Sequence, residues 1–212
     1  MVVNSMTYYE NDEGIANYES SDGNTKFTYR KINESEIEIV EWLSSASHII
    51  IPSHIDGDFK VVSLGERSFR NLLDVERIVV PLSVERICKG AFYALYEVQR
   101  SYYSTIYTLS YGEEHKKFCE IFLPAHVCID NISALLRGAE MRNKFGSYER
   151  TIYDSLVITF LNSPTCNYMI ENEWRVACQN DELAVLVHKS FGYPFHLFDF
   201  KNYVIEYPEC WR

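Results

Sequence analysis

One pattern of hydrophobic and polar residues recurs at three places along the chain. Residues 48–55 (HIIIPSHI), 77–84 (RIVVPLSV) and 120–127 (EIFLPAHV) each read polar residue, three apolar residues, proline, two variable residues and a branched apolar residue. Alternation along a strand sends the first and third apolar residues to one face, and proline, which lacks an amide donor, ends the ladder. The pattern predicts three short strands whose core-facing pairs are Ile49 and Ile51, Ile78 and Val80, and Ile121 and Leu123.

A second recurrence keeps a period of 23 residues. Leu64 is followed after 23 residues by Ile87, and Phe69 is followed after the same interval by Phe92. One such unit cannot cover its own apolar face, so we expect successive units to stack and to share one interior. The bends expected between these anchors are at Gly65 and Gly90.

These residues resemble a known repeat. Residues 72–92 follow, almost throughout, the BspA-type leucine-rich repeat, which reads roughly Leu-x-x-Ile-x-Ile-Pro-x-x-Val-x-x-Ile-Gly-x-x-Ala-Phe. Residues 54–65 (HIDGDFKVVSLG) resemble its longer first unit, and residues 27–42 (FTYRKINESEIEIVEW) resemble the strand pair that caps such arrays. The resemblance is clearest over residues 25–95. It implies a right-handed solenoid with a parallel sheet, in a family used for adhesion and protein recognition rather than catalysis.

The fold class expected from these features is an α/β-type right-handed leucine-rich-repeat solenoid. It is β-rich, with short parallel strands, an irregular insertion and an α+β C-terminal cap or appendage. Residues 1–24 are expected to form an N-terminal segment that is partly disordered, and residues 25–135 to form the solenoid and its N-terminal cap. The insertion falls at 93–119, and residues 136–212 form the C-terminal cap or a small α+β region.

The region beyond the repeats gives weaker signals. Residues 135–155 (LLRGAEMRNKFGSYERTIYDS) have helical composition. Residues 155–164 (SLVITFLNSP) fit a fourth strand with Ile158 and Phe160 facing inward. Residues 165–212 keep no period, and we expect them to act as a cap, since arrays need polar-faced ends that stop further stacking.

The strand residues between the core-facing pairs point outward, and they form an unusual row. A solvated sheet face normally carries polar residues, so apolar residues on adjacent strands suggest a contact surface for another molecule. An alternative that remains open is that the insertion or the C-terminal region folds over this face. The predicted binding residues of this face are Ile50, Val79 and Phe122. Arg77 and Glu120, each two residues earlier on the same strand face as Val79 and Phe122, are also included.

A tyrosine-rich stretch at 92–111 (FYALYEVQRSYYSTIYTLSY) is a second candidate for binding. Tyrosine offers a large contact area at low entropic cost and keeps a polar tip, and loops on rigid scaffolds often carry recognition. A strand pair with half-buried tyrosines explains the same residues. The candidate binding residues of this stretch are Tyr96, Tyr102, Tyr103 and Tyr107.

Charge narrows the classes of partner. The formal net charge is −10, and residues 1–60 carry 11 acidic but only 4 basic side chains. Repulsion from phosphate argues against nucleic acid and anionic membrane surfaces, and it permits a basic protein partner, although solubility alone explains the same charge. No apolar run is long enough to span a membrane, and no signal is recognisable at the start. A cytoplasmic protein is therefore expected, or a surface or secreted one if a signal was trimmed.

Catalytic and metal-binding patterns are sparse. The six cysteines include no Cys-x-x-Cys pair, which favours buried free thiols in a reducing compartment over metal knuckles or a disulfide framework. His126 and Cys128 lie two residues apart, but the repeat frame explains them as structural residues. The segment His54–Asp58 fits a polar turn around Gly57 better than a cation site. We expect no catalytic residue, no metal and no cofactor.

The sequence therefore favours a non-enzymatic scaffold that recognises another protein. One alternative is an inhibitor of the immunity or phage-antagonist type, in which an acidic surface neutralises a basic toxin or defence enzyme. A second alternative is an enzyme with its site in residues 140–212, suggested only because that region lacks repeat order.

Overall fold

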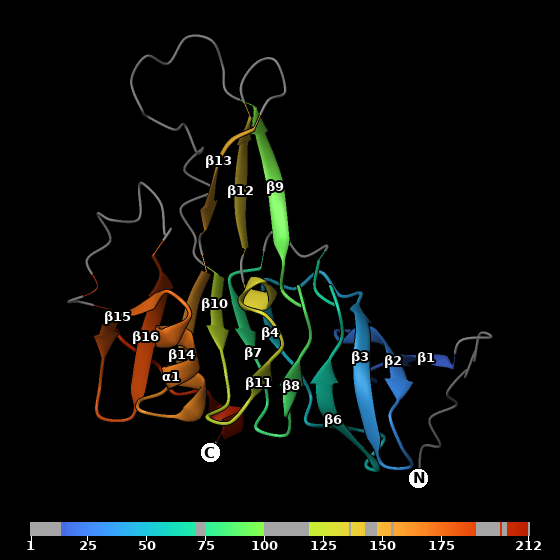
Figure 1. The fold of residues 1–212 in the computed structure, drawn as a ribbon. Coiled ribbons are helices and arrows are strands. Elements are labelled where there is room, and N and C mark those ends of the chain that lie inside the picture. The colour runs from blue at the N-terminus through green and yellow to red at the C-terminus, as the bar shows by residue number, and fades with distance from the viewer. Residues whose placement is uncertain are drawn as a thin grey trace.

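The computed structural model describes residues 14–70, 75–99, 119–135, 137–142, 148–153, 155–189, 200 and 203–211. Over these residues the fold is β-rich: three sheets are accompanied by a single α-helix, α1 (Pro164–Glu171). Within them, no helix combines the length and the apolar character needed to cross a bilayer. The β-rich character expected from the sequence is confirmed (Figure 1).

The seven-stranded sheet begins with an antiparallel meander and continues in parallel. β1, β2 and β3 pair antiparallel, and β3, β6, β8 and β11 then pair in parallel, with the short β5 joined to β6. Its strands are β1 (Ile15–Glu19), β2 (Lys26–Lys31), β3 (Glu36–Trp42), β5 (His54–Ile55), β6 (Phe59–Leu64), β8 (Arg86–Ile87) and β11 (Cys128–Ile129).

The six-stranded sheet has a parallel half and an antiparallel half. Its order is β15-β16-β14-β10-β7-β4, in which β4, β7, β10 and β14 are parallel and β15 and β16 complete the sheet antiparallel. Its strands are β4 (His48–Ile50), β7 (Arg77–Val79), β10 (Cys119–Phe122), β14 (Ser155–Phe160), β15 (Trp174–Gln179) and β16 (Leu183–His188).

The three predicted strands lie side by side in this sheet. Ile49 is in register with Ile78, and Ile78 with Ile121, so the parallel pairing expected from the pattern is confirmed. The residue before each proline donates the last hydrogen bond of its strand: Ile51 N to Val79 O at 3.0 Å, with equivalent bonds on the next two strands. Proline then ends the ladder because it has no amide hydrogen to donate.

The chain visits the two large sheets in alternation. It passes from β4 to β6, from β7 to β8 and from β10 to β11, so each passage adds one strand to each sheet. We call each such passage a rung. Residues from both sheets form one interior, to which the core-facing pairs of the three predicted strands all belong.

The 23-residue period appears directly in the packing of the rungs. Leu64 and Ile87 are in register between β6 and β8, and the rings of Phe69 and Phe92 lie 4.9 Å apart. Trp42 stacks on Phe69 at 5.4 Å, which continues the row of aromatic rings toward the N-terminal strands. The anchors that the period singled out are therefore contacts between neighbouring rungs.

Of the two bends expected at Gly65 and Gly90, only the bend at Gly90 is confirmed. Gly90 adopts the left-handed conformation with φ 68°, as a bend requires. The equivalent residue one period earlier is Arg67, which adopts φ 56°, whereas Gly65 is not left-handed. A side chain on Gly65 would place its Cβ 2.8 Å from Ile39 O, so this glycine permits close approach of β3 and does not make the bend.

The helical expectation for residues 135–155 is wrong. A three-stranded sheet forms there, in which β12 (Arg137–Arg142) pairs antiparallel with β13 (Tyr148–Tyr153) and parallel with β9 (Ala94–Gln99). Helix propensity is a weak preference that tertiary pairing overrides, and β9 supplies a strand edge from far along the chain. Figure 1 shows these three strands extending beyond the ends of the two larger sheets.

The fourth strand exists, but its faces were assigned wrongly. β14 pairs with β10 so that Val157 is in register with Ile121 and faces the shared interior. Ile158 and Phe160 lie on the opposite face of the sheet. The predicted alternation is shifted by one residue, and such a shift exchanges the two faces to which the side chains of a strand point.

The two large sheets extend across both predicted domain boundaries, at residues 24/25 and 135/136. β1 precedes residue 25 and pairs with β2, and β14 follows residue 135 and pairs in parallel with β10.

The helix α1 begins after Ser163, whose hydroxyl caps it by accepting from Cys166 N. Cys166 and Met169 of this helix pack into the interior that the rungs share.

Candidate protein-binding groove

The outward row of apolar residues shares one face of the six-stranded sheet, but most of it is covered. Val79 and Phe122 are 4% and 1% exposed, so these two residues are buried and offer no open contact surface. They belong to a second apolar cluster, to which residues of β14 and β16 also contribute. Residues 203–211, which we call the C-terminal strap, pack on this cluster. Of the two alternatives that the sequence left open, cover by the C-terminal region is what the structure shows for these two residues.

Trp211 anchors the strap. Its indole Nε1 donates to Val80 O at 2.8 Å, and its ring stacks on Phe160 at 5.2 Å. It also meets Phe122 edge to face at 6.1 Å. The indole therefore buries apolar area while its only polar atom is satisfied, which is the usual condition for a buried tryptophan.

The C-terminal strap leaves β4 uncovered at the end of the six-stranded sheet, over the described residues. Ile50 on β4 belongs to the same outward row, yet it is 60% exposed. A groove of about 710 Å³ lies there between the outer face of the sheet and the strap. It is lined by His48, Ile49, Ile50, Arg77, Val79, Phe122, Ile205, Glu206, Tyr207, Pro208, Glu209 and Cys210.

Charged residues define one side of this groove. Arg77 and Glu120 are in register on neighbouring strands, and Arg77 Nε lies 2.8 Å from a Glu120 carboxylate oxygen. The same guanidinium lies 3.5 Å from Glu206 of the strap and sits over the Phe122 ring. The Tyr203 hydroxyl donates to the other oxygen of Glu120. This network fastens the strap to the sheet at the groove.

The protonation states in the network follow from burial and pairing. Burial raises the pKa of Tyr203, and the hydrogen bond to Glu120 raises it further, so the phenol stays a donor. Burial alone would lower the pKa of Arg77, but the carboxylates of Glu120 and Glu206 outweigh it and the pKa is raised. The arginine is therefore fully charged and occupied by two carboxylates.

The structure thus brings together five of the nine predicted binding residues. Ile50, Val79, Phe122 and Arg77 line the groove, and Glu120 holds Arg77 in place. The strap residues of the network and of the groove wall were not identified from the sequence. The available signal was the density of aromatic and acidic residues in YVIEYPECW at residues 203–211, which has no strand or helix period.

The tyrosine-rich candidate is described only in part. Tyr96 lies on β9, where its main chain is in register with Ala139 of β12. Tyr102, Tyr103 and Tyr107 lie outside the described residues. Among the described residues, β9 pairs with β12, a strand that follows the insertion in the sequence.

The six cysteines form no disulfide in the structure, but not all of them are buried. Cys119 and Cys166 are buried, whereas Cys128 and Cys210 are exposed, so the expectation of burial is wrong for the exposed pair. Among the residues described, no group of three or more His, Cys, Asp or Glu side chains is placed to hold a metal ion. Burial raises the pKa of three buried or half-buried thiols and so lowers their thiolate fraction: Cys88, Cys166 and Cys178.

The comparisons with known proteins give one structural likeness. No protein-family model matches the sequence, and no curated protein matches it. Among solved structures, the chain is similar to the T. pallidum leucine-rich repeat protein, with 14% sequence identity and a TM-score of 0.26. The match covers 59% of this chain and 65% of that one, so this chain spans somewhat less than two thirds of that protein's length.

Proposed function

We propose that this chain is a non-enzymatic protein-recognition scaffold built on a right-handed leucine-rich-repeat solenoid of the BspA type. The repeat frame of residues 72–92 supports the family assignment, and the alternation of the chain between two sheets supports the stacked architecture. A reducing, cytoplasmic setting accords with six cysteines that form no disulfide.

The observation that carries the recognition role is the exposure of Ile50 beside the groove. The other two members of its apolar row are covered, and Ile50 is left 60% exposed on the last strand of the sheet. A single exposed isoleucine is ordinary, but here it adjoins a groove with an apolar floor and a charged wall. Apolar contact area with a polar rim is the usual composition of a protein interface.

A capture experiment tests the role. The full-length wild-type protein and Ile50→Asp are immobilised, and the proteins retained from a host-cell extract are identified and quantified by mass spectrometry. Ile32→Asp is the matched control, because Ile32 is 52% exposed and lies outside the groove. Both exposed substitutions are expected to change the free energy of unfolding by no more than about 0.5 kcal/mol, which thermal unfolding verifies.

We expect a stoichiometric partner to be retained by the wild-type protein and by Ile32→Asp, and to be lost from Ile50→Asp. Retention that is equal on all three proteins would reject the groove as the recognition surface. The absence of a stoichiometric partner on the wild-type protein would reject the recognition role.

A second candidate is inhibition of a basic toxin or defence enzyme, and the carboxylates of Glu206 and Glu209 at the groove wall favour it. Such a pair should associate more slowly as salt concentration rises, because attraction between opposite charges steers the encounter. Association that is independent of salt would count against this candidate.

A further inference from the structure

The main chain of β4 is available at the edge of the six-stranded sheet. Ile51 N donates to Val79 O at 3.0 Å, and Arg77 N donates to Ser47 O at 3.1 Å. Main-chain groups of successive strand residues point to opposite sides, so Ser47 and Ile51 use the side toward β7. The N–H and C=O of Ile50 therefore point away from β7. Over the described residues the sheet ends at β4, with no strand on that side.

The groove reaches this main chain. Ile49 lines the groove although it is only 1% exposed and its side chain packs in the interior on the other face. Its contribution to the groove therefore comes from the backbone. An extended segment that pairs with β4 would place every second side chain on the groove side, beside Ile50.

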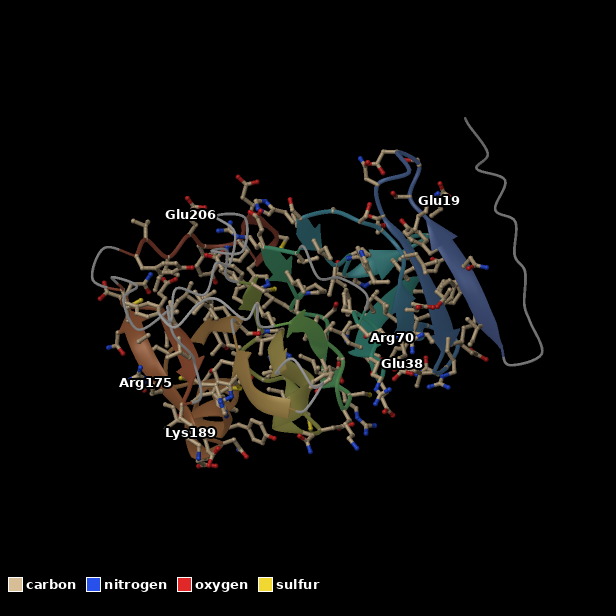
Figure 2. The ribbon with its side chains drawn as sticks, turned by 90° about the horizontal axis from the view of Figure 1, so that it is seen from above. Glu19, Glu38, Arg70, Arg175, Lys189 and Glu206 are labelled. Carbon is tan, nitrogen blue, oxygen red and sulfur yellow. The ribbon has the colours of Figure 1, made fainter. Side chains whose placement is uncertain are left out.

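The groove side has an excess of negative charge. Among the described residues that line the groove, Arg77 is the only Lys or Arg, and it is already paired with Glu120 and Glu206. Glu209 is a further carboxylate of the wall. Figure 2 shows Glu206 at the opposite margin of the molecule from Lys189. A lysine or arginine of a bound segment could lay its apolar stem on Ile50 and extend its charge toward these carboxylates.

A second copy of the chain fits this edge poorly. Each copy carries a formal net charge of −10, so two acidic grooves would be brought together by edge-to-edge pairing. Charge complementarity instead favours a basic partner.

We propose that the groove binds an extended, basic segment of another protein, which adds to β4 as a further strand in one fixed direction, either parallel or antiparallel. The inference rests on the proposed recognition function and specifies its partner. Main-chain hydrogen bonds to Ile50 supply the alignment, and alternate side chains supply the selectivity. The segment carries lysine or arginine on the face toward the groove and apolar residues on the other face.

Synthetic peptides test the mode of binding on the full-length, ¹⁵N-labelled protein. The probe is an acetylated, amidated hexapeptide in which lysine and valine alternate, and its counterpart replaces lysine with glutamate. Two isomers of the probe carry N-methyl groups on the three lysines or on the three valines, so that each isomer blocks one edge of the peptide. Amide chemical shifts and amide hydrogen exchange are followed up to about 1 mM peptide, the weak end of the affinity range.

We expect the lysine peptide to shift the amides of β4 and to slow hydrogen exchange of Ile50 N–H, and the glutamate peptide to have no effect. One N-methyl isomer should lose binding while the other keeps it, because a strand pairs through one edge. Equal binding of both isomers, or of the glutamate peptide, would overturn the proposal. No binding of the lysine peptide up to about 1 mM would overturn it as well.

Substitutions at β4 separate the main chain from the side chain. Ile50→Pro removes an amide that is directed outward and leaves the ladder to β7 intact, as edge strands tolerate. Ile50→Val removes a similar amount of side chain and keeps the amide. We expect Ile50→Pro to bind the lysine peptide about fivefold more weakly than Ile50→Val, the effect of one hydrogen bond. Equal affinities would contradict strand addition.

Failure of this mode is distinguishable from failure of the recognition role. A partner captured by the wild-type protein and lost from Ile50→Asp, combined with equal binding of both N-methyl isomers, would keep the function and reject strand addition. Sedimentation measures self-association in parallel. A dimer that Ile50→Asp dissociates would overturn the proposal of a basic partner in favour of a second copy.

Discussion

Arg67 and Gly90 occupy equivalent places in successive rungs, 23 residues apart, and both have left-handed backbone with φ of 56° and 68°. An L-residue in this conformation loses about 1–2 kcal/mol, whereas glycine adopts it freely. Glycine also gives the unfolded chain more conformational freedom, and this offsets about 0.4–1 kcal/mol of the stability gained from relieving the left-handed residue. Arg67→Gly should therefore stabilise the protein by about 0.8 kcal/mol, which raises the midpoint of thermal unfolding by about 2–3 °C for a chain of this length.

Scanning calorimetry and urea titration measure this change. Arg67→Ala is the matched control, because it removes the same guanidinium but keeps a Cβ, and we expect no gain in stability from it. Gly90→Ala should destabilise the protein by about 0.8 kcal/mol for the reverse reason. Equal changes in the midpoint for Arg67→Gly and Arg67→Ala, or a lower midpoint for Arg67→Gly, would show that Arg67 and Gly90 are not conformational equivalents.

Three further predictions concern the strap, the close approach of β3 and a buried histidine. Trp211→Ala should destabilise the protein by about 3–5 kcal/mol in urea titration. Trp211→Phe should destabilise it less, because phenylalanine keeps an aromatic ring and loses only the hydrogen bond to Val80 O. Equal losses of stability for the two variants would show that the ring does not contribute. Gly65→Ala should lower the thermal midpoint, because its Cβ would lie 2.8 Å from Ile39 O, and an unchanged midpoint would contradict that contact. Burial lowers the pKa of His188 below its ordinary 6.5, so the unfolded chain binds more protons between the two pKa values. The free energy of unfolding should therefore fall as pH drops through 6.5 toward the folded pKa, and His188→Gln should remove that part of the pH dependence; identical pH profiles for the two proteins would exclude it.

The rungs could be predicted from the sequence because their signals are local. Three apolar residues followed by proline define where a strand alternates and where it must stop, and Phe69 and Phe92 mark the same interval independently. The pairing of Ile49, Ile78 and Ile121 follows from these signals alone. Local chemistry fixed the register because a shift of one residue would turn the buried pairs toward solvent.

The remainder depends on contacts between distant parts of the chain. The β12 segment has helical composition and becomes a strand because β9, some forty residues earlier, pairs with it. Val79 and Phe122 belong to an outward row that the sequence identifies, but the packing of the strap on this face, with Trp211 against Phe122, accounts for their burial. Alternation assigns a residue to a face and cannot say what covers that face.

The same distinction applies to the candidate site. Arg77 and Glu120 were placed on one face by alternation, and the structure adds that they pair at 2.8 Å. Glu206 could not be assigned to the groove from the sequence, because the strap has no period that relates it to the sheet. The groove is formed where a periodic sheet meets an aperiodic segment, so sequence pattern alone finds only one of its walls.

Site-specific photocrosslinking tests the recognition claim most directly. A benzoylphenylalanine placed at position 50 of the full-length protein, and at position 32 in a matched control, is irradiated in the cells that make the protein. Both side chains are exposed, at 60% and 52%, so a difference between them reports location and not accessibility. We predict a discrete adduct with a single partner from position 50 and none from position 32. Adducts that are absent at position 50, or the same at both positions, would contradict recognition through the groove.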